Sequence, residues 1–205
     1  MWKRTGRLFI LGVLALALPG FGQNRVFVTN DTFSGNLGGL AGGDTICQRE
    51  ADAVPLGGSW VAWLSTVNPQ VNAVDRLSAG SFALLDSTPV AASIADLTDG
   101  NIANPINLTP TSQVVQGPVW TGTATTGLPG APPNDCTGWT AGPFGWYGEA
   151  SRSDGGWTFV DTLPCDDALR LYCFEVQAAP TLPQWAALGL ALLLLAGPAL
   201  SLRRQ

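Results

Sequence analysis

The sequence has no histidine, and its only lysine is Lys3. Histidine is the usual general acid or base near neutral pH, so this form of catalysis is excluded. The Gly-x-Ser-x-Gly nucleophile motif is also missing. What remains for an enzyme is a carboxylate pair for glycoside hydrolysis such as Glu149 with Asp154, which nothing else in the sequence singles out. These absences favour a protein without catalytic activity.

Positive charge is scarce as well. Residues 25 to 176 contain all 15 acidic residues but only five of the 10 basic ones, which gives a net charge of −10. Such a surface repels phosphate groups, so nucleic acids and anionic lipid surfaces are not expected as partners. It permits divalent cations and neutral or cationic partners, although an acidic surface also serves simply to keep an exported protein soluble.

The N-terminus has the three parts of a secretory signal peptide. Lys3, Arg4 and Arg7 precede an apolar stretch of 11 residues, 8 to 18, and Gly20 and Gly22 supply small residues for cleavage before residue 23. Eleven apolar residues are too few to span a bilayer. A cleaved signal peptide over 1–22 therefore explains this end better than a membrane helix does.

The C-terminus contains a stretch without charge from residue 185 to 202, followed by Arg203 and Arg204. At about 1.5 Å per residue this stretch would form roughly 27 Å of helix, enough to cross the core of a bilayer. The two arginines are expected on the cytoplasmic side, which places the preceding chain outside the membrane.

The whole tail, 177–205, resembles a sorting signal of Gram-negative bacteria, the IPTL-CTERM type. The motif that carries the resemblance stands just before the apolar stretch and consists of Pro180, Thr181, Leu182, Pro183, Gln184 and Trp185. The resemblance implies recognition and cleavage by a membrane-embedded, exosortase-like enzyme. An ordinary single-span anchor is the alternative.

The four cysteines are an even number, which suits an exported protein. They are Cys47, Cys136, Cys165 and Cys173, and in an oxidising compartment two disulfides are the expected arrangement. A zinc site is the alternative, but the sequence has no Cys-x-x-Cys pair and no histidine to complete one. Eight tryptophans together with 25 glycines and 15 prolines indicate one loop-rich domain held by large aromatic side chains.

Short strands are predicted along the domain, at 26–29, 60–65, 82–85 and 169–174, with the last strand near the first. A helix is expected to start at an N-cap, Asp44, and to end at Ala53, and 72–77 is a turn or a short helix. Three similar segments around Trp120, Trp139 and Trp157 are predicted to be consecutive strands of an antiparallel sheet.

Several segments, taken in order, resemble DUF1554, a bacterial family of unknown function related to the C-type-lectin and endostatin fold. They span most of 25–176 and comprise residues 25–29, 36–47, 62–65, 95–100, 119–122 and 170–174. The resemblance implies an α+β, C-type-lectin-like domain with a mostly antiparallel sheet, long loops and the disulfides Cys47–Cys173 and Cys136–Cys165. It implies a fold rather than a function.

Calcium is the one cofactor that the sequence suggests. Sugar-binding C-type lectins hold calcium with a Glu-Pro-Asn or Gln-Pro-Asp loop and a Trp-Asn-Asp strand. Here the counterparts are 104–106 and 157–159, which lack the carboxylates. A separate candidate is the oxygen-rich loop with Asp96, Asp99 and Asn101, although Asp-x-x-Asp-Gly is also a common turn.

Long loops on a disulfide-linked scaffold favour a recognition module. The predicted loops 101–118 and 123–156 contain four aromatic residues of interest, and the ligand-binding candidates are Trp139, Trp146, Tyr147 and Asn104, with Phe144 beside them. Such rings either stack on a sugar or protein ligand or cover the core beneath the loops. We therefore expect an exported, non-catalytic module of the cell envelope or surface that binds a glycan or a protein. A structural component of an extracellular polysaccharide matrix is the alternative.

Overall fold

The computed structural model describes residues 22–132 and 134–177. Almost all of the predicted signal peptide, together with the sorting motif and the C-terminal apolar stretch, lies outside the described residues, so these assignments stay predictions. Within the described residues, no helix is long and apolar enough to cross a bilayer.

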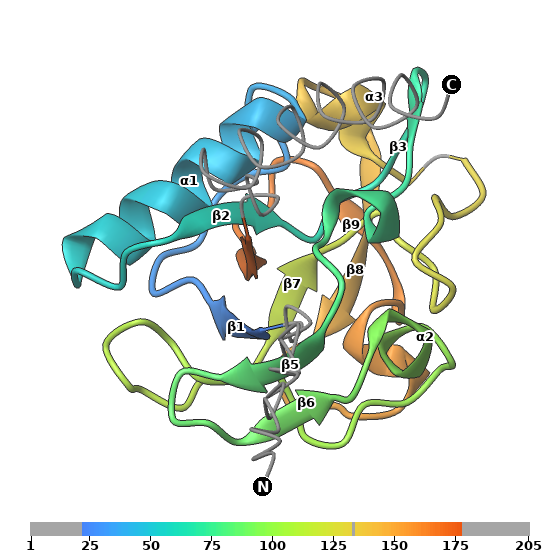
Figure 1. The fold of residues 1–205 in the computed structure, drawn as a ribbon. Helices are drawn as coiled ribbons and strands as arrows, with labels where there is room; N and C mark the ends of the chain where they lie inside the picture. Colours follow the sequence, from blue (N-terminus) through green and yellow to red (C-terminus); the bar gives the residue numbers. More distant parts are fainter. Residues whose placement is uncertain (1–21, 133, 178–205) are drawn as a thin grey trace, which may run out of the picture.

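A mixed sheet of eight strands forms the centre of the domain (Figure 1). Its eight strands are β1 (Gln23–Val28), β2 (Ser59–Ala62), β5 (Ser81–Leu84), β6 (Pro89–Ala91), β7 (Pro118–Trp120), β8 (Phe144–Glu149), β9 (Asp161–Pro164) and β10 (Arg170–Val176). Two further strands, β3 (Thr66–Val67) and β4 (Gln70–Val71), lie outside it. The strand order in the sheet is β6–β5–β1–β10–β7–β8–β9, with β2 also paired to β10, while β3 and β4 form a separate hairpin. Most pairs are antiparallel, but β1–β5 and β10–β7 are parallel.

Helices are short apart from the first. They are α1 (Leu40–Ala53), α2 (Ile94–Leu97), α3 (Cys136–Trp139) and the 3-10 turns η1 (Val74–Arg76) and η2 (Gly155–Trp157). In Figure 1, α1 lies along β2 on one side of the sheet. Together these elements confirm the predicted α+β class with a mostly antiparallel sheet, whereas the relation to C-type lectins stays a prediction.

The start of α1 differs from the prediction, because Asp44 is inside the helix and is not its N-cap. Its carboxylate instead accepts the N–H of Ala62 at 2.9 Å and pairs with Arg76. Two glycines extend the helix beyond the predicted start despite their low helix propensity. A Cβ on Gly42 would lie 1.8 Å from a carbonyl oxygen, and one on Gly43 would lie 2.8 Å from Leu64, so tight packing requires glycine at both positions.

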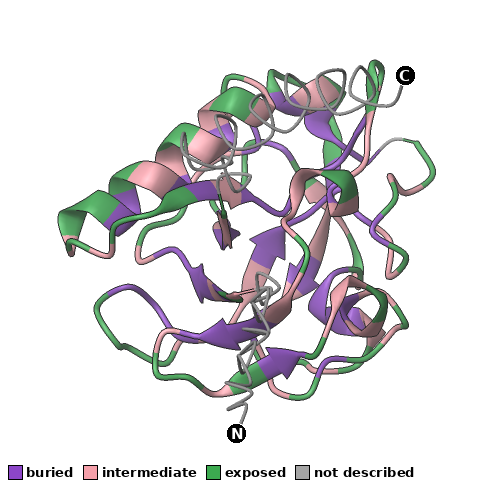
Figure 2. Cartoon of the chain, in the orientation of Figure 1, coloured by how far each residue is buried: buried purple, intermediate pink, exposed green. Residues whose placement is uncertain are grey.

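Two apolar clusters fill the faces of the central strand β10, and Figure 2 shows the sheet mostly buried. Alternate residues of β10 divide between them, with Tyr172 and Phe174 in one cluster and Leu171 and Cys173 in the other. This alternation follows the period of a strand that is covered on both faces.

The disulfides join Cys47 to Cys173 and Cys136 to Cys165, with Cα–Cα distances of 5.4 and 5.8 Å. The first connects α1 to β10, and the second connects α3 to the end of β9. This is the pairing that the family resemblance implies. The expectation of two disulfides is therefore confirmed.

The prediction of three consecutive tryptophan strands was wrong in part. Trp120 does end β7, but Trp139 lies in α3 and Trp157 in η2. Each of these two tryptophans follows a glycine, and each buries its indole completely from a turn. The partner strands of β7 are instead β8 and β10, and β9 pairs with β8. Strand β8 lies inside a segment that was predicted to be a loop.

Candidate functional site

The helical turn α3 is left-handed. Its residues have φ angles of 46° at Cys136, 54° at Thr137, 69° at Gly138 and 63° at Trp139. Only glycine adopts this conformation freely, and each other residue costs roughly 1–2 kcal/mol. Strained backbone of this kind persists only where the surrounding structure holds it, and it gathers at functional sites.

Trp139 is the main residue that holds this turn. Its side chain is fully buried, and its indole N–H donates to the carbonyl oxygen of Ser65 at 2.9 Å. Its own carbonyl oxygen accepts three consecutive N–H groups, those of residues 37 to 39, at 2.9 to 3.1 Å. A side chain with no exposed surface has no contact with a ligand. Trp139 is thus a core residue, and its assignment as a ligand-binding residue is corrected.

A hollow of about 290 Å³ lies beside this turn, where the β3–β4 hairpin, α3 and the start of β8 meet. These elements are near the top of Figure 1, where β3 and α3 are labelled. We call it the Phe144 hollow, and its walls are Val67, Asn68, Pro132, Asp135, Thr137, Gly138, Pro143 and Phe144. Its volume is at the lower end of the range typical of small-molecule sites.

The Phe144 hollow combines one exposed ring with a few polar groups. Phe144 leaves 43% of its surface exposed. Asp135 is buried, and one of its carboxylate oxygens accepts the N–H of Val67 at 2.9 Å, so its position is fixed. The side chains of Asn68 and Thr137 add polar atoms at the rim, and no lining residue is basic. The arrangement suits a neutral ligand that offers both an apolar face and hydroxyl groups.

Trp146 lies on the same face of β8 as Phe144, because residues two apart in a strand point to the same side. It is half-buried, and the ring of Phe159 stacks on it with 3.8 Å between centroids. A Cβ added to Gly130 would lie 2.1 to 2.3 Å from three atoms of the indole, so the Gly130 backbone packs closely against the ring. Phe159 and Gly130 therefore both contact Trp146 within the protein. Phe159, which is 38% exposed, presents the outer ring instead.

Tyr147 points to the opposite face of β8, away from the Phe144 hollow. It packs against the second apolar cluster. Burial raises the pKa of the Tyr147 hydroxyl, and the negative charges of Glu149 and Asp161 raise it further. The structure therefore separates Tyr147 from Trp146, although the sequence grouped them.

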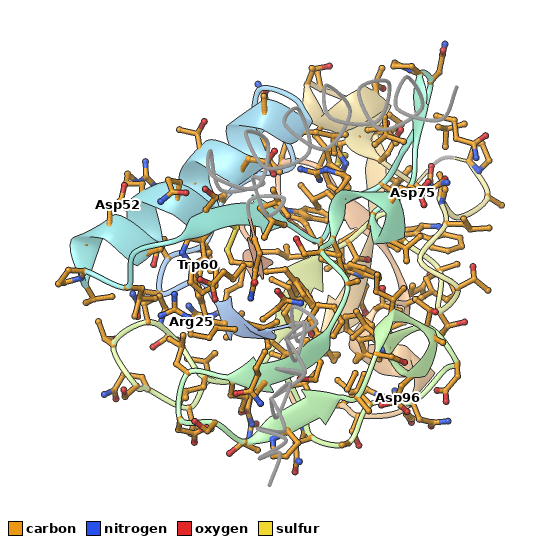
Figure 3. All side chains as sticks on the ribbon, in the orientation of Figure 1. Arg25, Asp52, Trp60, Asp75 and Asp96 are labelled. Atoms are coloured by element: carbon orange, nitrogen blue, oxygen red, sulfur yellow. A yellow bond between two sulfur atoms is a disulfide. The ribbon has the colours of Figure 1, made fainter. Side chains whose placement is uncertain are left out.

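Asn104 and the calcium candidates lie elsewhere. The Asn104 amide donates to the carbonyl oxygen of Pro89 at 2.9 Å. The Asp96 carboxylate accepts the N–H of Ala92 and completes the capping of α2, while Asp99 accepts the N–H of Asn101 in a local turn. Figure 3 shows Asp96 at the lower right, far from β3 and α3. No cluster of three or more histidine, cysteine or acidic side chains suited to a metal occurs in the described parts, 22–132 and 134–177.

The carboxylate pair proposed for hydrolysis is not arranged as an acid and a base. Both Asp154 oxygens accept hydrogen bonds from Arg152, at 2.7 and 2.6 Å. Hydrogen bonding to Arg152 lowers the pKa of Asp154, whereas a general acid of a glycosidase needs a raised pKa. Glu149 is on the Tyr147 face of β8.

The sequence did not indicate the walls of the Phe144 hollow other than Phe144 itself. Asn68, Pro132 and Asp135 come from segments far apart in the chain, and each looks like an ordinary loop residue. The one signal near them is Cys136, whose disulfide fixes where Asp135 lies. Compared with known proteins, the chain matches no family model and no curated protein.

Proposed function

We propose that this chain is an exported, non-catalytic recognition module that binds a neutral glycan in the Phe144 hollow. The observation that carries the proposal is the exposed ring of Phe144 set against fixed polar groups on a strained, disulfide-linked turn. A sugar has an apolar face that stacks on an aromatic ring and hydroxyl groups that bond to polar side chains.

Charge supports a neutral ligand. The domain has a net charge of −10, and its arginines at 25, 76 and 152 are each paired with a carboxylate. No arginine lines the hollow. An anionic glycan would be repelled, so we infer an uncharged one. Calcium is held by several oxygen ligands, and the wall of the hollow contains only one carboxylate. We therefore infer that side chains bind the sugar directly, without a calcium ion.

Delivery is the second part of the proposal. The signal peptide exports the chain, and the tail holds the domain at the membrane until an exosortase-like enzyme processes the motif at 180–185. The product is a C-type-lectin-like domain, related to DUF1554, at the envelope or outside the cell. Changing Pro180, Thr181, Leu182 and Pro183 to alanine tests this step. A longer, membrane-retained form is expected, and a wild-type protein that is itself full-length and membrane-bound would show a plain anchor.

Binding is tested by titrating the exported protein with a panel of neutral oligosaccharides, with and without a calcium chelator. Phe144→Ala should weaken binding about fivefold, because a stacked ring contributes about 1 kcal/mol. The matched control is Val114→Ala, which truncates a side chain that is 69% exposed away from the hollow. Equal binding by the two variants, or binding that the chelator removes, would contradict the proposal.

A further inference from the structure

A row of rings extends from the Phe144 hollow along one face of the sheet. Phe144 and Trp146 are two residues apart on β8, which separates them by about 7 Å along the strand. Phe159 continues the row through its stack on Trp146. The two ends of the row, Phe144 and Phe159, are both exposed, at 43% and 38%, and the middle ring is half-buried.

We propose that this row binds the interior of a neutral polysaccharide chain, with one sugar on Phe144 and a later sugar on Phe159. The inference rests on the proposed function, since Phe144 is the first of its two subsites. Successive units of a linear glycan present ring faces at regular intervals, which matches two exposed rings on one face. A monosaccharide would use Phe144 alone.

Phe159 is held in place, as a second subsite requires. Its neighbour Thr158 is fully buried, accepts the indole N–H of Trp63 at 2.9 Å and donates to the carbonyl oxygen of Thr123 at 3.0 Å. On its other side, the N–H of Val160 donates to Tyr147 at 2.8 Å. The ring is thus fixed before the ligand arrives, so little conformational entropy is lost on binding.

Trp146 is a positioning residue in this arrangement. The ring of Phe159 stacks on the indole, and the Gly130 backbone packs closely against it. Trp146 therefore sets the angle of Phe159, and the exposed ring of Phe159 is the one that contacts sugar.

Charge selects the class of polymer. The arginines of the described residues are engaged with other groups. Those at 25, 76 and 152 pair with carboxylates, Arg170 donates to backbone carbonyl oxygens, and Arg49 lies over the ring of Phe33. The structure therefore shows none of them free to bind a phosphate, sulfate or uronate group on the row. A neutral homopolymer or heteropolymer is the occupant that this surface fits.

The experiment compares disaccharides and hexasaccharides of cellulose, N-acetylated chitin and amylose by calorimetric titration of the exported protein. Wild type should bind one hexasaccharide about fivefold more tightly than the matching disaccharide, the effect of one further stacked ring. Phe159→Ala should remove this difference and leave disaccharide binding unchanged. Phe144→Ala should weaken both ligands, and Val114→Ala should change neither.

Phe159→Tyr provides the rescue, because it keeps an aromatic ring in the same stack and should restore the preference for the longer ligand. A loss of preference in both variants would show a structural effect and overturn the second subsite. Equal affinity of wild type for short and long ligands would overturn it too, with the proposed function intact. If none of the sugars binds, or if the hollow takes a peptide instead, both proposals fail.

Discussion

The indole N–H of Trp139 donates a hydrogen bond of 2.9 Å to the carbonyl oxygen of Ser65, and both residues are fully buried. This bond joins the left-handed turn to the segment that leads into β3, and residues of both elements line the Phe144 hollow. The shape of the hollow is therefore coupled to the core through one side chain.

Trp139→Phe should destabilise the domain by about 1–3 kcal/mol, because the buried carbonyl of Ser65 loses its partner. It should also weaken ligand binding in the hollow. The control is Trp60→Phe, since Trp60 is equally buried in the same cluster and donates to Gly57 at 2.8 Å. Chemical denaturation should show a smaller loss for Trp60→Phe, because Gly57 is exposed and its carbonyl oxygen can bond to water instead. If Trp60→Phe weakened binding as much, the coupling would be absent.

The two disulfides should differ in what they stabilise. The Cys47–Cys173 bond spans 126 residues and the Cys136–Cys165 bond spans 29, so loop entropy gives roughly 5 and 4 kcal/mol respectively. Double serine replacement of the first pair should lower the unfolding free energy more. Replacement of the second pair should lower the unfolding free energy less than replacement of the first. It should weaken ligand binding more, because Cys136 begins the strained turn. Denaturation and titration of both variants test this, and the reverse ranking of affinities would contradict it.

Acid should remove one specific interaction. Arg25 makes two hydrogen bonds to the Glu175 carboxylate, at 2.8 and 2.7 Å, and its guanidinium carbon lies 5.3 Å from the centroid of the Trp60 ring. Figure 3 labels Arg25 and Trp60. Hydrogen bonding to Arg25 lowers the pKa of Glu175 in the folded protein.

The stability from this pair is present above the ordinary glutamate pKa of about 4.3 and is lost as the pH falls through the lower, folded value. Glu175→Gln should therefore be less stable than wild type at neutral pH, and the difference should vanish in acid. Thermal unfolding across this range measures it, with Asp166→Asn as an exposed control. A difference that persisted in strong acid would point to packing instead.

Alkali should act through Tyr172. Its side chain is fully buried, and burial raises its pKa well above that of a free tyrosine, with the charge of Glu149 adding to the shift. Because the folded pKa is higher than the unfolded one, stability is complete below about pH 10 and falls as the pH rises further.

The tyrosinate absorbance of a Tyr147→Phe variant reports Tyr172 alone, as the chain has two tyrosines. That absorbance should appear only together with unfolding, which circular dichroism follows. Ionisation of Tyr172 in a folded domain would show that its environment is wetter than the structure indicates.

The sequence predicted the strands that carry a local signal. The alternation of residues 169–174 and the β-branched run at 26–29 were enough for β10 and β1, which do pair. It failed where a residue acts through tertiary contacts. Trp139 looked like a loop aromatic, but three N–H groups and Ser65 hold it in the core. Likewise Trp146 and Tyr147 are neighbours in sequence, and nothing local shows that β8 sends them to opposite faces.

The candidate site was still harder to predict because its walls come together only through long-range geometry. Asp135 and Val67 are 68 residues apart and are joined by one hydrogen bond. The turn that follows Asp135 has glycine-like φ angles at residues that are not glycine, for which the sequence has no marker. The sequence identified Phe144 as an aromatic residue, but it did not show that Phe144 would be exposed next to Asp135 and Val67.

The first and last described segments of the chain meet. The N–H of Gln177 donates to Ser78 at 2.8 Å, and a Cβ on Gly22 would touch the Gln177 side chain. A domain whose entry and exit points coincide can be inserted into a surface loop of a host protein without stretching either one. Residues 22–177 are therefore suited to grafting as a cassette, which would display the Phe144 hollow on a carrier of choice.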